Sequence, residues 1–186
     1  MIKLDFPTSR QDNYCSCGTA AVQSMLAYYG IDEVLDSLSE ELHLDHNGVC
    51  YKQMIKLFKK RKLDVEYGTM NRKKLKEYIN KKIPIIVLIQ AYKNNETKPY
   101  TLTSYKDGHY VTIIGYSTRR FIIEDPSLNN ELGYINNKDL DIRWHGLGED
   151  KDEKLFFFGI AVIGIPKYKP NKLQEVRWGF KIHDYF

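Results

Sequence analysis

Cysteine is scarce in this sequence, and its scarcity argues against a fold held together by disulfides. The chain has three cysteines, which cannot all pair with one another, and Cys15 and Cys17 are too close in sequence for a relaxed bridge. A reducing compartment therefore fits better than an oxidising one. In such a compartment a cysteine thiol is available for a chemical reaction.

The sequence also lacks the apolar segments that cross a membrane or direct secretion. The longest nearly unbroken apolar run covers residues 155–166, which is twelve residues with two glycines. A membrane helix needs about 18–20 apolar residues. Residues 1–7 contain no apolar core of a secretory signal. We therefore expect no membrane span and a cytoplasmic protein.

The composition is that of an ordinary globular protein. The chain has 186 residues, of which 42% are hydrophobic and 28% are charged, and this is enough apolar material for one packed core. No internal repeat and no low-complexity linker divides the sequence. We expect one domain over residues 1–166 and a C-terminal extension of unknown role over residues 167–186.

Helical periodicity dominates the first half of the chain, and strand-like runs dominate the second. The first predicted helix begins near Gly18, with Ser16 as its N-cap, and ends at Gly30. Further helices are predicted at residues 31–42, 51–58, 71–80 and 137–144, and strands at residues 83–89, 109–116, 120–124 and 155–165. Helices followed by antiparallel strands predict an α+β fold.

Basic residues are concentrated between residues 52 and 82, which hold twelve Lys and Arg against three Asp and Glu. Such a stretch can bind nucleic acid, an anionic membrane surface or an acidic protein. It can also be the solvated faces of two short amphipathic helices. Because no nucleic-acid motif accompanies the charges, we expect no nucleic-acid partner and favour solvated helix faces. An acidic partner remains the alternative.

Cys17 is the strongest candidate for a nucleophile because it precedes Gly18 at the predicted start of the first helix. The helix macrodipole and the unpaired N–H groups at that position favour a thiolate. Gly18 would allow a substrate backbone to approach. Such a cysteine still needs a base, a group that orients the base and a donor for the oxyanion.

His109 is the candidate base, since it opens an apolar strand and so stands at the mouth of that strand. Asp125 ends the next strand, and the spacing of sixteen positions from His109 suits two strands joined by a short turn. The hairpin would bring both side chains to one end of neighbouring strands, where a carboxylate can fix the imidazole tautomer. Taken singly, His109 could merely cap its strand, and Asp125 could be only a turn residue before Pro126.

Gln11 is the candidate oxyanion donor, six residues before Cys17. A side-chain amide there can point back at the nucleophile, and the backbone N–H of Cys17 can supply a second donor. Donors of this kind typically contribute about 10²–10³ in rate.

The segment QDNYCSCGTAA at residues 11–21, followed by MLAYYG at 25–30, resembles the active site of the bacteriocin-processing cysteine peptidases. These are papain-like peptidases that cut after double-glycine leaders. The similarity continues with DGHYV at 107–111 and EDPS at 124–127, so it spans most of the chain. The resemblance implies a papain-like α+β fold with helices packed on an antiparallel sheet. It also implies Cys17 as nucleophile, His109 as base, Asp125 as third member and Gln11 as oxyanion residue.

The sequence departs from the exporter members of that family. No G-x-x-x-x-G-K-[ST] motif for a nucleotide occurs, and no membrane domain follows. We therefore expect a stand-alone member whose substrate the exporters do not reveal.

Two alternative uses of the other cysteines remain open. Cys15 could be the nucleophile, although no glycine follows it and it breaks the spacing to the glutamine. A zinc site could use His43, His46 and Cys50, with Asp45 between them. No C-x-x-C pair and no obvious fourth ligand support that site, so an exposed helix end and a packing role for Cys50 are simpler interpretations.

The resulting prediction is a cysteine peptidase or amide hydrolase that acts on a peptide or a protein tail and requires no metal or organic cofactor. A catalytically silent papain-like module that binds peptides is one alternative. An acyltransferase is another, because an amine can capture the same thioester that water hydrolyses. The sequence does not distinguish water from an amine as the acceptor.

Overall fold

The structure is a computed structural model that describes residues 1–93, 99–128, 132–149 and 152–171. Its centre is an antiparallel sheet in the order β2-β9-β3-β4-β5-β6, with the short strand β1 paired to β4. The strands are β1 (Ile2–Lys3), β2 (Asp64–Thr69), β3 (Ile85–Gln90), β4 (Gly108–Tyr116), β5 (Arg120–Glu124), β6 (Gly133–Asn136) and β9 (Phe158–Ile163). A separate hairpin is formed by β7 (His145–Leu147) and β8 (Lys154–Phe156).

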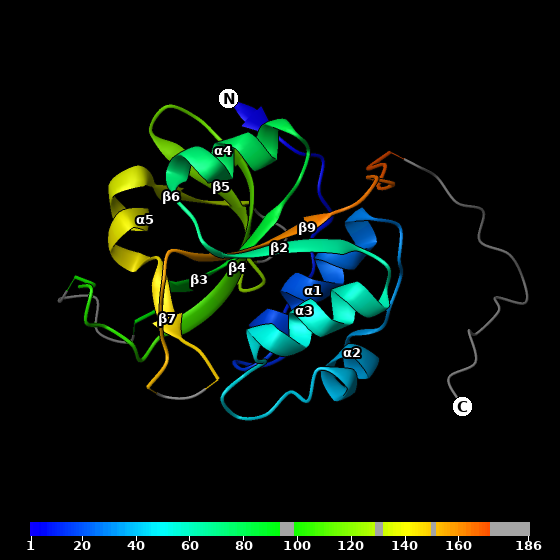
Figure 1. The fold of residues 1–186 in the computed structure, drawn as a ribbon, viewed down its shortest axis with the longest axis horizontal. Helices are drawn as coiled ribbons and strands as arrows, with labels where there is room; N and C mark the ends of the chain where they lie inside the picture. Colours follow the sequence, from blue (N-terminus) through cyan, green and yellow to red (C-terminus); the bar gives the residue numbers. More distant parts are fainter. Residues whose placement is uncertain (94–98, 129–131, 150–151, 172–186) are drawn as a thin grey trace, which may run out of the picture.

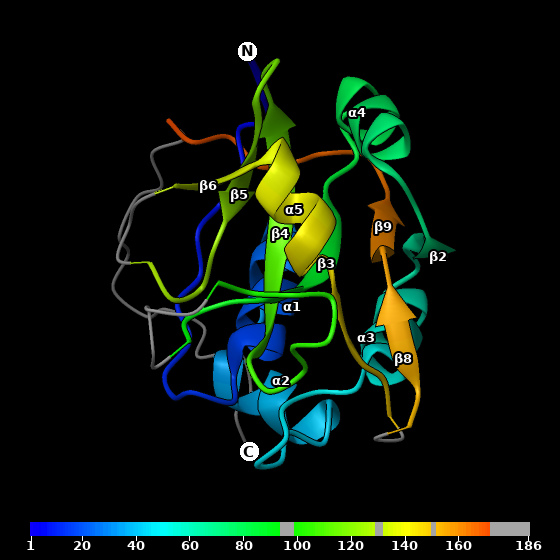
Figure 2. The ribbon, with the colours of Figure 1, turned by 90° about the vertical axis from the view of Figure 1, so that its left-hand side faces the viewer.

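The helices cover the sheet from both sides. They are α1 (Cys17–Tyr28), α2 (Leu35–Glu41), α3 (Tyr51–Lys60), α4 (Arg72–Asn80) and α5 (Asn137–Arg143). Helices α1, α2 and α3 gather on one side (Figure 1), and Figure 2 shows α5 on the opposite side, in front of β3 and β4. Helix α1 packs directly on β4. The α+β prediction is therefore confirmed, with the N-terminal helices lying against the C-terminal sheet.

The apolar runs that marked strands do become buried strands. All six residues of β3 are buried, and so are seven of the nine residues of β4. Strands β4 and β5 form the predicted hairpin, in which Thr112 lies opposite Glu124. This register directs the end of β5 toward the start of β4, which is where the candidate base and carboxylate were expected to meet.

Two predicted elements differ from the structure, and an edge strand was not predicted. The helix predicted at 31–42 is shorter, since only Leu35–Glu41 is helical. The strand predicted at 155–165 is two strands, because Phe157 has a φ of 53°, a left-handed conformation that interrupts the ladder. Strand β2 was missed because most of its residues are exposed, as befits the edge of the sheet.

The chain beyond the last strand begins by packing against the domain. The backbone N–H groups of Lys167 and Tyr168 both donate to the carbonyl oxygen of Tyr28, at the end of α1. The division at residue 166 stays a prediction, and residues 172–186 of the expected extension lie outside the described residues. Within the part of the chain that is described, no helix combines the length and the apolar character needed to cross a membrane.

Candidate active site

Cys17 is the first residue of α1, and its side chain is 7% exposed. Its backbone N–H lies in the first turn, where a helix offers no internal acceptor. Among the described residues this N–H has no other backbone acceptor. The sulfur and a free N–H therefore stand together at the positive end of a buried helix, which is an environment that favours an anion.

Ser16 precedes α1 but does not cap it with its side chain. Its hydroxyl oxygen instead accepts from the backbone N–H groups of Asp12 and Asn13, both at 3.2 Å, and donates to the Asp12 carboxylate and the carbonyl of Asn13. The N-cap prediction was thus right about position and wrong about bonding. The buried Ser16 braces the loop that carries the chain from Gln11 to Cys17.

Gly18 serves packing, and this corrects the expectation that it leaves room for a substrate. A Cβ atom added at Gly18 would lie 2.6 Å from the terminal methyl of Met54 on α3 and 3.2 Å from the ring of Tyr110 on β4. Real Cβ atoms essentially never lie as close as 2.6 Å to another atom, and a contact of 3.2 Å is already tight. The glycine therefore lets α1 sit close to both α3 and the sheet, which fixes Cys17 relative to the strand that carries His109.

The hairpin brings His109 and Asp125 together as predicted. Nε2 of His109 lies 2.7 Å from Oδ1 of Asp125, and both side chains are buried. The Cys17 thiol is near enough to the same ring to contribute to the raised pKa of His109. Because Asp125 holds Nε2, the other ring nitrogen, Nδ1, is the one left to face the sulfur. Three side chains from α1, β4 and the end of β5 thus form one contact series.

The charged forms of His109 and Asp125 stabilise each other. Burial favours the neutral ring of His109, but hydrogen bonds with Asp125 and Cys17 outweigh it and raise the pKa of His109 to about 9. Burial works against the Asp125 carboxylate too, yet hydrogen bonds from His109, Tyr92 and the backbone of Ser127 hold the pKa of Asp125 below its usual value. An imidazolium facing a carboxylate is therefore the favoured state of the pair near neutral pH.

Tyr92 belongs to the site although nothing in the sequence pointed to it. Its hydroxyl donates to Oδ2 of Asp125 at 2.7 Å, and its ring meets the His109 ring edge-on with centroids 5.2 Å apart. Its φ is 58°, a conformation that is uncommon for a residue with a side chain and that often occurs at functional sites. Tyr92 thus covers the contact between His109 and Asp125 at the point where β3 ends.

Gln11 is fixed at both ends of its side-chain amide. Nε2 donates to the carbonyl oxygen of Asn13 at 2.8 Å, and Oε1 accepts from the hydroxyl of Ser127 at 2.9 Å. Its backbone N–H donates to the carbonyl oxygen of Pro126, directly after Asp125. The structure therefore links Gln11 to the loop that leads into Cys17 and to the turn that follows Asp125.

The remaining cysteines have separate surroundings. Cys15 donates its thiol to the carbonyl oxygen of His46 at 3.2 Å. The sulfur of Cys50 accepts from the backbone N–H of Lys52 at the start of α3. In the described ranges no group of three or more His, Cys, Asp or Glu side chains is placed to hold a metal ion. The zinc alternative with His43, His46 and Cys50 finds no support there.

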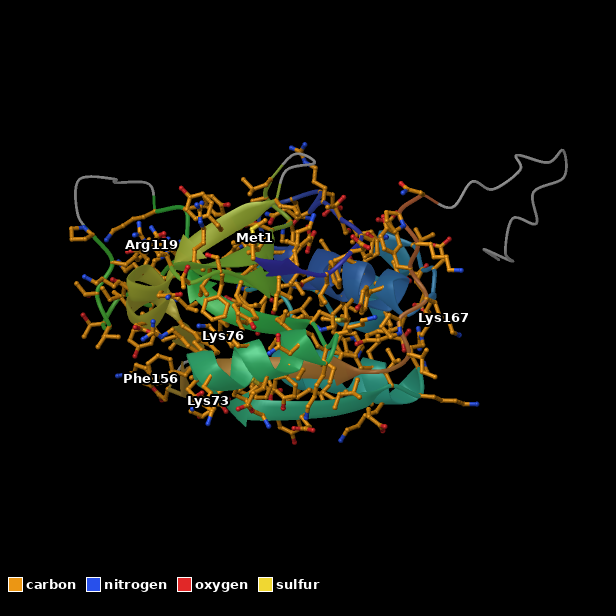
Figure 3. All side chains as sticks on the ribbon, turned by 90° about the horizontal axis from the view of Figure 1, so that it is seen from above. Met1, Lys73, Lys76, Arg119, Phe156 and Lys167 are labelled. Atoms are coloured by element: carbon orange, nitrogen blue, oxygen red, sulfur yellow. The ribbon has the colours of Figure 1, made fainter. Side chains whose placement is uncertain are left out.

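The basic stretch at residues 52–82 is distributed over α3, β2 and α4. Several of its cations are neutralised by ion pairs, among them Lys60 with Glu41, and Arg61 with both Glu33 and Glu41. Others, such as Lys73 and Lys76, lie on the surface helix α4 (Figure 3). This distribution favours the interpretation as solvated helix faces.

Comparison with known proteins identifies related folds. A model of the Peptidase_C39 like family matches residues 3–151 of the chain. The fold is similar to a C39-like peptidase from Bacillus anthracis, with a TM-score of 0.65, 15% identity, and 89% of this chain and 98% of that chain covered. It is also similar to the peptidase domain of Streptococcus ComA, a bifunctional ABC transporter involved in quorum sensing, with a TM-score of 0.61, 17% identity, and 87% and 98% covered.

A third similar structure is a double-glycine motif protease from an AMS/PCAT transporter in complex with the leader peptide. Its TM-score is 0.61 at 16% identity, and the match covers 86% of this chain and 92% of that chain. At such identities the likeness shows a shared fold, which is the expected papain-like peptidase fold. No curated protein matches the chain.

Proposed function

The chain belongs to the Peptidase_C39 like family, and on that premise we propose that it cuts a peptide or protein tail by means of Cys17, His109 and Asp125. Family membership supports a cysteine peptidase. The observation that carries the residue assignment is the buried contact series of thiol, imidazole and carboxylate. Such a series is what activates a sulfur nucleophile in general.

The first half of the reaction forms a thioester. The Cys17 thiolate adds to the carbonyl carbon of the scissile amide, and the electron pair of the C=O bond moves onto oxygen. The N–H of Cys17 and the second amide N–H of Gln11 hold this oxyanion. Protonated His109 gives its proton to the leaving nitrogen as the C–N bond breaks, which leaves the acyl group on the sulfur.

The second half of the reaction restores the enzyme. Neutral His109 takes a proton from water, and the hydroxide adds to the thioester carbonyl. The C–S bond then breaks, the carboxylic acid leaves, and Cys17 is again a thiolate facing a protonated ring. Asp125 orients the ring and stabilises its positive charge in both halves, as the third member of a triad does.

Iodoacetamide labelling tests the assignment of the nucleophile. The wild type and Cys15→Ala are expected to be carboxamidomethylated rapidly at residue 17, because the protonated His109 stabilises a thiolate there. Cys17→Ala should lose this rapid modification. Mass spectrometry of the digested protein locates the label. Labelling that survives Cys17→Ala and disappears in Cys15→Ala would contradict the assignment, and the absence of rapid labelling in any form would favour a silent binding module.

Tyr92→Phe tests whether the Tyr92 hydroxyl stabilises the Asp125 carboxylate. Removal of one donor from Asp125 is expected to raise the pKa of that carboxyl by about one unit, since a hydrogen bond to a charged group contributes about 1.5–3 kcal/mol. The acid limb of the pH profile of Cys17 alkylation should therefore move to higher pH. Tyr134→Phe on β6 is the matched control, because Tyr134 is exposed and packs on Arg120. Superimposable profiles for the two variants would contradict the role of Tyr92.

The remaining expectations concern the two alternative functions, an acidic partner, the location and the substrate. The alternatives of a silent module and an acyltransferase receive no support from the comparisons. An acidic partner at residues 52–82 and a cytoplasmic location stay predictions. The substrate also remains a proposal, since the leader peptide belongs to the AMS/PCAT relative.

A further inference from the structure

We infer that Ser127 is a positioning residue for the oxyanion site, because its hydroxyl helps to hold the Gln11 amide in the orientation that the Asn13 carbonyl selects. The inference rests on the proposed function and adds to it a residue that acts through Gln11. It depends on the hydrogen bonds of the turn that follows Asp125.

The orientation of the Gln11 amide follows from its two partners. The carbonyl oxygen of Asn13 can only accept, so the atom 2.8 Å away from it must be the nitrogen, Nε2. The other end is then the oxygen, and the Ser127 hydroxyl donates to it at 2.9 Å. An amide nitrogen carries two N–H groups. Within the described residues only the one toward Asn13 has an acceptor, so the second is available for an oxyanion.

Without the Ser127 hydroxyl, one end of this amide would lose its protein partner. The amide could then rotate about its last side-chain bond, since such terminal torsions are broad and roughly two-fold. A rotated amide would present its carbonyl oxygen instead of an N–H, and an oxygen repels the developing oxyanion. The Asn13 carbonyl therefore selects the productive orientation, and the hydroxyl of Ser127 stabilises it.

Ser127 is itself held rigidly by the triad carboxylate. Its backbone N–H donates to Oδ1 of Asp125 at 2.9 Å, and the N–H of Leu128 donates to the carbonyl of Asp125 at 3.0 Å, which closes a turn with Pro126 at its second position. The carbonyl of Pro126 accepts from the backbone N–H of Gln11. One short turn thus orients the base through Asp125 and the oxyanion donor through Ser127.

Two reagents separate these two roles without knowledge of the natural substrate. p-Nitrophenyl acetate acylates the sulfur: an S–C bond forms through an oxyanion, the bond to p-nitrophenolate breaks, and water later releases acetate. Iodoacetamide alkylates the same sulfur by displacement of iodide and forms no oxyanion. A defect in the oxyanion site should slow acylation and leave alkylation unchanged.

Ser127→Ala is expected to slow the p-nitrophenolate burst about 10-fold, less than the 10²–10³-fold typical of losing an oxyanion donor outright, because Gln11 is still present. Its alkylation rate should stay within about two-fold of wild type, because no oxyanion forms in that step. Ser127→Thr retains the hydroxyl and should restore the burst. Ser37→Ala, an exposed serine on α2, is the control and should match wild type in both reactions.

A double-mutant cycle decides whether Ser127 acts through Gln11. In the Gln11→Ala background, Ser127→Ala should cause no further loss of burst rate, because the group it positions is gone. A further 10-fold loss in that background, or an unchanged burst in Ser127→Ala, would overturn the inference. Equal slowing of acylation and alkylation would do so too. A wild type with no burst and no rapid alkylation that depend on Cys17 would instead overturn the proposed function.

Discussion

Replacing His109 with alanine is expected to lower the steady-state turnover of p-nitrophenyl acetate by about 10³-fold, within the range of 10²–10⁴ that general acid–base catalysis typically contributes. Both halves of the proposed reaction need this ring. It stabilises the thiolate that attacks, and it activates the water that frees the acyl group. Turnover followed by p-nitrophenolate release at neutral pH, with protein folding checked by thermal unfolding, measures the loss.

The control for His109→Ala is His46→Ala, since His46 is exposed on a loop. This variant should turn over the ester at the wild-type rate. A loss comparable to that of His109→Ala would revive the metal alternative. A folded His109→Ala protein with wild-type turnover would show that the imidazole ring takes no part in the mechanism.

His109 and Asp125 together set the pH at which the imidazolium of the site disappears. Because the pKa of His109 is raised to about 9, the protonated ring that supports the thiolate is lost only above that pH. Asp125→Asn removes the carboxylate that helps to raise this pKa, so His109 should lose its proton at lower pH. The pH at which the imidazolium disappears, followed by NMR of the ring protons, should therefore decrease in this variant. An unchanged value would contradict the role of Asp125.

The catalytic candidates could be predicted from the sequence because each sits at a position with a local signature. Cys17 stands before a glycine at a helix start, and the spacing of His109 and Asp125 fits a hairpin. The hairpin register then confirmed that these two side chains meet. Their geometry follows from strand pairing, which apolar runs indicate well.

Tyr92 could not be predicted in the same way, because its place depends on tertiary contacts. It stands in a polar loop segment with no periodicity, and its left-handed backbone is not a conformation that a tyrosine favours. Strand β2 escaped prediction for a related reason. As an edge strand with mostly exposed residues, it lacks the apolar run that a central strand such as β3 shows. The interruption at Phe157 likewise could not be predicted, because no turn residue marks it in the sequence.

Glu124 is the source of the second large effect that we expect, a pH dependence of the free energy of unfolding. Glu124 is 1% exposed, and its carboxyl accepts from the backbone N–H of Ser9 at 3.1 Å, while the hydroxyl of Ser24 on α1 lies 3.3 Å away. Burial raises the pKa of Glu124 to about 8, although these hydrogen bonds oppose the rise. Between pH 4.5 and 8 the folded chain therefore keeps a proton that the unfolded chain has released.

The sign of the pH dependence follows from this proton. Where the folded state binds more protons than the unfolded state, the free energy of unfolding decreases as pH rises, here by up to about 1.4 kcal/mol per pH unit across the window. Glu124→Gln keeps the shape, has no proton to lose and should remove this slope. Urea unfolding of both proteins from pH 5 to 8 measures it. The contribution of His109 has the same sign, but it is present in both proteins and cancels in the comparison.

The neutral state of Glu124 also bears on the site. A protonated Glu124 can donate to Ser24, whose own proton then goes to the carbonyl of Ala21 at 3.1 Å, so every group in this buried network has a partner. A neutral Glu124 also places no negative charge beside Asp125. Such a charge would raise the pKa of Asp125 and weaken its pairing with His109. Glu124→Gln should therefore retain acylation of Cys17 while it flattens the stability curve. Parallel curves for wild type and variant would mean that Glu124 is ionised in the folded protein.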